Sequence, residues 1–263
     1  MERWRSHLPV GIYLLVMLTF IYLPVIILVL FSFQHGVLPV PPFEGPSLEW
    51  YYKAFSNDRL MDALLNSIVI AVTSSLCATI LGFLAAYGMF KHTPFGARSL
   101  RFLLMAPMTV SYLIIGLGLL IVFNYVGIGK SLLSVGIAHA LINLPICYAI
   151  VFSQFGGHLR NIDNAAHDLG ASDWQTMRYV IIPVMTPPML AGFLISATLS
   201  WDEFIIAFLL SSFDVTLPVM IFEMLRAGLT PEVNAAGTIV FAISVAMALL
   251  AAIAILARKG PKQ

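Results

Sequence analysis

Six long apolar runs alternate with shorter polar segments along the whole chain. Each run reaches or exceeds the roughly 20 apolar residues that an α-helix needs to cross a bilayer. The pattern therefore predicts an all-α membrane protein with six transmembrane helices in a single domain over residues 1–263. The predicted spans are residues 8–33, 63–90, 102–123, 131–153, 185–210 and 233–257.

The first run follows a basic start that contains Arg3 and Arg5, so a secretory signal peptide is the alternative interpretation. The run is longer than the roughly 7–15-residue apolar core of such peptides, and no small-x-small cleavage site follows it. We therefore predict a first transmembrane helix that is bent near Pro24, because proline disturbs helical hydrogen bonding.

Composition supports the membrane assignment. Of the 263 residues, 60% are hydrophobic and 10% are charged, and the mean hydropathy is +0.93. Soluble domains carry about 25% charged residues, so a soluble globular protein is excluded. Cys77 and Cys147 both lie inside apolar runs, which favours packing roles over a disulfide.

The distribution of lysine and arginine predicts the orientation, because cytoplasmic loops are enriched in these residues. With the N-terminus in the cytoplasm, the outer loops hold only Lys53, Arg59, Lys130 and Arg226. The inner segments then hold Arg3, Arg5, Lys91, Arg98, Arg101, Arg160, Arg178, Arg258, Lys259 and Lys262. Both termini are therefore expected in the cytoplasm, together with residues 161–183, which we call the coupling module.

The coupling module is a polar segment with the signals of a helix–glycine–helix unit. Asn161 is expected to cap the first helix, and Gly170 is placed where a left-handed residue would end it. Ser172 and Gln175 have the spacing of a capping box at the start of the second helix. Pro183 lacks a backbone N–H and is expected to stop or kink that helix.

The first helix of the module carries Ala165, Ala166 and Leu169 at neighbouring positions of one face. Small side chains let another surface approach closely, so this face suits docking into a groove of a partner protein. The capping signals alone favour an ordinary helical hairpin loop over a docking unit, and that alternative stays open at this point.

Asp202 and Glu203 lie within the fifth apolar run, directly after Trp201. Charges inside a span are costly and usually face a cavity or a partner. Neighbours on a helix point about 100° apart, so one carboxylate can line a path for a cationic substrate while the other contacts a helix. Trp201 is a candidate cation–π partner. In the alternative interpretation, the acids lie near a helix end or subunit contact and are structural.

No catalytic or cofactor site is evident in the sequence. Gly129-Lys130-Ser131 resembles the end of a phosphate-binding loop, but Asn124 occupies the position of the required first glycine. The 6 histidines show no i,i+4 pair, and no nucleophilic triad is recognisable. We therefore expect a non-catalytic chain that binds no metal, cofactor or nucleic acid.

The coupling module resembles the EAA loop of bacterial ABC importer permeases at Asn164-Ala165-Ala166, Gly170 and Ile182-Pro183. The segments SLEWYYKAF, LLNSIVIAV and LSWDEFIIAFLL are similar to the spermidine/putrescine permease group, in particular its C-type subunit. The resemblance covers nearly the whole chain and implies a type I ABC importer permease fold. Asn164 departs from the usual glutamate and cannot supply its negative charge, which weakens one contact without abolishing docking.

The resemblance implies a permease subunit that moves polyamine from the periplasm to the cytoplasm through the bacterial inner membrane. Its expected partners are an ABC ATPase dimer that uses ATP and Mg²⁺, a second B-type permease or a second copy, a periplasmic solute-binding protein and membrane lipid. The substrate path is expected at Trp201, Asp202 and Glu203. The expected contacts with the ATPase are Asn164, Ala165, Ala166, Asp168, Leu169, Gly170 and Pro183.

Other functions remain alternatives. The same importer class also carries other small solutes, such as aminophosphonates and iron. An ion-gradient-driven transporter would leave the coupling module unexplained, and no clear internal repeat supports it. An intramembrane enzyme lacks a catalytic constellation.

Overall fold

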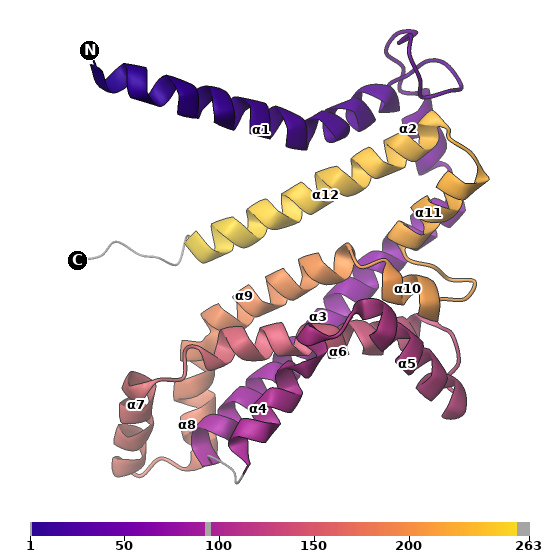
Figure 1. Cartoon of the computed structure of the whole chain (residues 1–263). Coiled ribbons are helices and arrows are strands. Elements are labelled where there is room, and N and C mark those ends of the chain that lie inside the picture. The colour runs from indigo at the N-terminus through magenta and orange to yellow at the C-terminus, as the bar shows by residue number, and fades with distance from the viewer. Residues whose placement is uncertain (1, 93–95, 257–263) are drawn as a thin grey trace. The chain divides into compact units, whose positions relative to one another are not determined.

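The computed structural model describes residues 2–92 and 96–256 and is helical through most of this part (Figure 1). In those residues the β-structure is confined to an isolated bridge between Gln34 and Pro46. The helices are α1 (Glu2–Ser32), α2 (Glu49–Phe55), α3 (Asp58–His92), α4 (Ala97–Met105), α5 (Tyr112–Tyr125), α6 (Leu132–Phe152), α7 (Gly157–Asp168), α8 (Asp173–Thr176), α9 (Ile182–Trp201), α10 (Ile205–Leu210), α11 (Leu217–Ala227) and α12 (Pro231–Leu256).

Five of these helical segments are long and apolar enough to cross a membrane. They comprise most of α1, all of α3 and α6, the continuous helical segment from α8 to α9, and most of α12. The all-helical, six-span fold class is confirmed when the bent pair formed by α4 and α5 is counted as the sixth span. The prediction of a single domain stays a prediction.

The third predicted span, residues 102–123, is broken rather than straight. Its two halves, Ala97–Thr109 and Tyr112–Tyr125, meet at 106°. A 3₁₀ turn at Ala106–Thr109 contains Pro107 near its start, and Val110 then adopts an extended backbone. Proline removes a backbone donor, so the helix tightens and ends here instead of continuing.

The fifth predicted span also ends earlier than expected. α9 stops at Trp201, and residues 202–204 separate it from the short α10. Asp202 and Glu203 therefore lie at a helix break, as in the alternative that placed them near a helix end. α1, in contrast, continues through Pro24, and Figure 1 shows it changing direction along its length.

The chain divides into two compact units. The first comprises Met1–Met61 and Met220–Ile243, and within it Asn57 Nδ2 donates to Glu232 Oε1 at 3.1 Å. Between Val10 and Leu30, most apolar residues of α1 are exposed. A surface of this kind is typical of contact with lipid or with another membrane subunit.

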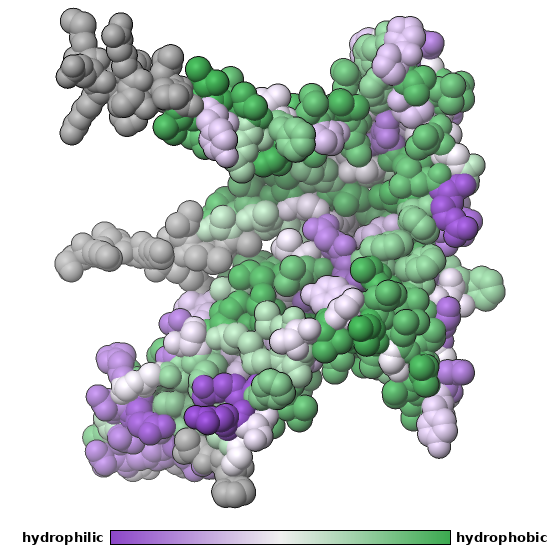
Figure 2. All heavy atoms as spheres, viewed as in Figure 1, coloured by the Kyte–Doolittle hydropathy of each residue, from purple (hydrophilic) through white to green (hydrophobic). Residues whose placement is uncertain are grey.

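The second unit comprises Asp62–Val219 and Ser244–Gln263, and its core lies where α3, α6 and α9 pack together. Small polar residues let these helices approach, as in the bond between Ser196 Oγ and Ser75 Oγ at 3.0 Å. Cys147 is buried in this packing, whereas Cys77 is exposed, and both thiols are free. In Figure 2, hydrophobic residues cover much of the visible surface, and hydrophilic residues gather at the end that carries α7 and α8.

At Gly82, α3 and α6 approach each other closely. A Cβ atom added there would lie 2.8 Å from the backbone nitrogen of Tyr148 and 3.0 Å from Cys147 Cβ. Because the nearest atom belongs to a helix backbone, it cannot move without shifting α6. The absence of a side chain at Gly82 therefore sets the distance between two spans.

We expect Gly82→Ala to lower the free energy of unfolding by about 1–3 kcal/mol, the usual cost of overpacking. The measurement is reversible denaturation in detergent. Gly88→Ala in the same helix is the matched control, because an added Cβ there meets nothing within 4 Å. The control should be neutral or gain up to about 1 kcal/mol from helix propensity. Equal effects of the two substitutions would contradict the close-approach explanation.

Candidate functional site

The first helix of the coupling module begins earlier than the sequence suggested. α7 starts at Gly157 with Gly156 as its N-cap residue, so the prediction that Asn161 caps the helix is wrong. Leu159 is 3% exposed and joins the apolar cluster of the second unit. Burial of this side chain favours a helix that extends back past Asn161, which outweighs the local capping preference.

The turn after α7 has the expected conformation. Gly170 has φ = +86°, in the left-handed region that favours glycine. Its N–H donates to His167 O at 2.8 Å, and the Ala171 N–H donates to Ala166 O at 3.0 Å. These two bonds form a Schellman motif, which satisfies carbonyls at the end of the helix.

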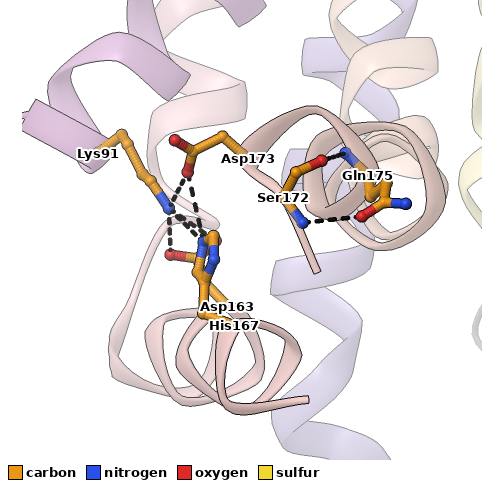
Figure 3. Close-up of polar contacts among 6 residues, drawn as sticks. All are labelled: Lys91, Asp163, His167, Ser172, Asp173 and Gln175. Carbon is orange, nitrogen blue, oxygen red and sulfur yellow. Dashed lines mark hydrogen bonds and ion pairs between the residues drawn. The ribbon is translucent and has the colours of Figure 1, made fainter. Parts of the chain in front are cut away.

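The capping box at the start of α8 is confirmed (Figure 3). The Gln175 N–H donates to Ser172 Oγ at 3.3 Å, and the Ser172 N–H donates to Gln175 Oε1 at 2.8 Å. Pro183, however, does not stop the second helix. A π-helical turn at Met177–Ile181 precedes it, and the segment continues as a helix to Trp201. The π-helical turn changes which backbone groups form hydrogen bonds, next to Pro183, which has no N–H to donate.

A charge cluster joins both helices of the module to the end of α3 (Figure 3). Lys91 Nζ lies 2.9 Å from Asp163 Oδ2, 3.0 Å from Asp173 Oδ1 and 2.8 Å from His167 Nε2. Arg160 adds a second link to α3, because its Nη2 donates to the carbonyl oxygen of Phe90 at 3.2 Å. The module is therefore attached to a spanning helix by several polar contacts.

Sequence reasoning missed this cluster. Asp163 and His167 have i,i+4 spacing and could have been recognised as a pair on one face of α7. Lys91 is 72 residues from Asp163, and no local pattern links the two. Within the residues that the structure describes, no three His, Cys, Asp or Glu side chains are arranged to hold a metal ion.

The residues expected to contact an ATPase are mostly on the outside of the module. Leu169 is 90% exposed and is the most prominent apolar side chain of the turn. Ala166 is half-buried, and Pro183 is exposed but lies in α9, away from the turn. The other exposed members of the set are Asn164, Ala165, Asp168 and Gly170.

The exposure of Asn164 bears on its departure from the family pattern. Its side chain points away from the protein interior, whereas the neighbouring Asp163 is buried and makes the ion pair with Lys91. The missing glutamate charge is therefore not needed to hold the module onto α3. Asn164 belongs to the exposed surface of α7.

Glu203 supports the helix break after α9. Its two carboxylate oxygens accept hydrogen bonds from the Ile206 N–H at 3.1 and 3.0 Å, and one also accepts from the Ala207 N–H at 3.2 Å. His139 Nε2 lies 3.3 Å from the same carboxylate, and His139 Nδ1 lies 2.7 Å from Ser200 Oγ. The buried carboxylate thus satisfies the first N–H groups of α10, which otherwise have no helical partner.

Asp202 and Trp201 have different surroundings. Trp201 is 2% exposed, and its indole N–H donates to Ser244 Oγ at 3.1 Å. Asp202 is exposed, and its Oδ1 accepts from Ser244 Oγ at 3.3 Å. Asp202 and Glu203 line a pocket of about 380 Å³, but Trp201 does not. The other residues that line the pocket are Tyr112, Thr198, Leu199, Phe204 and Ile205.

These geometries lead us to expect that Glu203→Gln destabilises the chain more than Asp202→Asn. The amide keeps one acceptor oxygen but places an NH₂ donor against N–H groups, at a cost of about 1–3 kcal/mol for unsatisfied buried groups. Reversible denaturation of both variants in detergent would measure the difference. Equal stability of the two variants would show that Glu203 does not support the break.

The family model described as "Binding-protein-dependent transport system inner membrane component" matches residues 78–259. The chain is 33% identical over 240 residues to the spermidine/putrescine transport system permease protein PotC of Haemophilus influenzae, covering 90% of this chain and 93% of the relative. It is 32% identical over 235 residues to the putrescine transport system permease protein PotI of Escherichia coli, covering 86% and 83%.

The fold is also found in a solved structure. A crystal structure of a bacterial alginate ABC transporter, in complex with alginate pentasaccharide-bound periplasmic protein, matches with a TM-score of 0.74 at 14% sequence identity. The match covers 98% of this chain and 96% of that chain, and at this identity it concerns the fold alone. The family match and the sequence relatives lead to one conclusion: the chain belongs to the family of inner membrane components of binding-protein-dependent transport systems.

Proposed function

We propose that this chain is the non-catalytic permease subunit of an ATP-driven importer that moves polyamine from the periplasm to the cytoplasm. The observation that carries the coupling proposal is the exposed turn around Leu169 and Gly170, which is attached to a spanning helix through Lys91. Such a turn can receive a displacement from a partner and pass it to the membrane helices.

The proposed orientation places the coupling module and both termini in the cytoplasm of a bacterial cell. It rests on the excess of lysine and arginine in the segments assigned to that side. In this orientation α9 begins next to the coupling module on the cytoplasmic side, and Asp202 follows its opposite end. Substrate would therefore meet this carboxylate from the periplasmic side before it reaches the cytoplasm.

The proposed partners supply what this chain lacks. A pair of ATPase subunits would bind ATP and Mg²⁺ and contact the coupling module from the cytoplasm. A second permease of the B type would complete the translocation path, and the exposed apolar surface of α1 suits such a subunit or lipid. A periplasmic binding protein would deliver the substrate.

The polyamine proposal has two supports. The relatives described above are named for spermidine and putrescine transport. In this chain, Asp202 presents an exposed carboxylate at a pocket that Tyr112 also lines. A pocket lined by a carboxylate and an aromatic ring suits an alkylammonium group, which the carboxylate attracts by charge and the ring by its π-face.

We expect Leu169→Ala to weaken association with the ATPase about tenfold or more, since burying a leucine side chain at an interface contributes about 1.5–3 kcal/mol. Affinity of the ATPase for the reconstituted permease in nanodiscs would be measured directly. Leu48→Ala is the control, because Leu48 is 54% exposed but lies outside the coupling module. Unchanged affinity in Leu169→Ala would remove this residue from the contact.

We expect Asp202→Asn to lower ATP-dependent polyamine uptake about tenfold, the scale of one charge-assisted hydrogen bond. Uptake of spermidine, putrescine and a non-cationic solute would be measured in proteoliposomes that contain the complete transporter. Asp214→Asn changes another exposed acid outside the pocket and serves as the control. Normal ATP hydrolysis by the wild type without polyamine uptake would retain the importer and reject this substrate.

A further inference from the structure

Lys91 is the next-to-last residue of α3 and occupies the centre of the charge cluster. An ammonium group has three donors and no acceptor. The three nearest partners of Lys91 Nζ are Asp163, Asp173 and His167, at 2.9, 3.0 and 2.8 Å. His167 accepts from the ammonium when its Nε2 carries no proton. One partner for each donor fixes the direction of the lysine side chain.

The partners of Lys91 lie on both sides of the Gly170 turn. Asp163 and His167 precede the turn in α7, whereas Asp173 follows it as the first residue of α8. One ammonium group therefore connects three helices. The backbone bonds of the turn connect only neighbouring residues, so they do not link the module to α3.

Burial distinguishes the pair of Lys91 and Asp163 from an ordinary surface ion pair, whereas the side chain of Asp173 is 73% exposed. The side chain of Asp163 is 8% exposed and that of Lys91 is 17% exposed. In the exposed pair of Lys53 and Glu49, the corresponding values are 49% and 50%. Water and salt screen an exposed pair, which contributes little, whereas a buried carboxylate depends strongly on its cation.

We propose that Lys91 is a positioning residue that makes the coupling module and α3 move together. The proposal rests on the proposed function, in which a partner ATPase displaces the turn around Leu169. Arg160 and the buried Leu159 attach only the first half of α7 to the rest of the second unit. α8 is continuous with the spanning helix α9, and Lys91 links both sides of the turn to α3, so a displacement of the turn reaches α3 as well as α9.

The test uses the complete transporter in proteoliposomes. For each variant, three quantities are measured: the amount of assembled complex, ATP hydrolysis stimulated by the binding protein, and substrate uptake per ATP hydrolysed. The wild type tests the proposed function first, because a chain that supports no ATP-dependent uptake fails there, whatever the role of Lys91. The Lys91 variants are then compared with a wild type that transports.

Three variants separate positioning from stability. Lys91→Met leaves Asp163 buried without its cation and should lower the amount of folded chain. Lys91→Met combined with Asp163→Asn removes both charges, so the assembled amount should recover while the link stays absent. Lys91→Arg retains a cation that can donate to both carboxylates. Lys53→Gln disrupts the exposed pair and is the matched control.

In the combined variant, we expect uptake per ATP to fall about fivefold or more, the lower range of typical coupling between sites. Lys91→Arg and Lys53→Gln should keep the wild-type ratio. A purely structural role changes the amount of complex but leaves uptake per ATP unchanged. A wild-type ratio in the combined variant, or an equal loss of the ratio in Lys91→Arg, would overturn the proposal.

Discussion

Every backbone N–H and C=O that leaves a helix inside a membrane must find a partner within the protein, because lipid offers none. The structure meets this requirement at several breaks of the second unit. The Ser131 N–H donates to the carbonyl of Leu210 at 2.9 Å, at the end of α10. The Leu217 N–H donates to Ser67 Oγ at 2.7 Å, and Asn66 Nδ2 donates to the carbonyl of Val215 at 3.1 Å.

The same requirement gives the adjacent acids Asp202 and Glu203 different roles. The start of α10 leaves N–H groups that need an acceptor, and the buried Glu203 supplies it. Asp202, one residue earlier, remains exposed at the pocket. The helix break that Glu203 supports thus leaves a second carboxylate, that of Asp202, exposed at the pocket.

In the coupling module of the same unit, local hydrogen bonds satisfy the backbone groups at the helix ends. The Schellman motif at Gly170 and the capping box at Ser172 satisfy the ends of α7 and α8 without help from the rest of the chain. The module is therefore compact by itself, and its charged side chains can bind another part of the chain. Asp163 and Asp173 of the module bind Lys91 at the end of α3.

The sequence by itself determined the features that depend on neighbouring residues. The apolar runs specified membrane helices because their length matches the bilayer, and Gly170, Ser172 and Gln175 specified the turn through backbone conformation and short-range hydrogen bonds. Local signals failed where a distant contact was stronger. Asn161 does not cap α7, because burial of Leu159 starts that helix earlier.

Only the tertiary structure decided which charged residues meet and which remain exposed. The contact between Lys91 and Asp163 spans 72 residues, and the one between His139 and Glu203 joins α6 to the break between α9 and α10. Hydrophobic pattern and capping chemistry act over a few residues, so they cannot specify such pairs. Burial and electrostatic attraction in the folded chain do so, and they distinguish the structural Glu203 from the exposed Asp202.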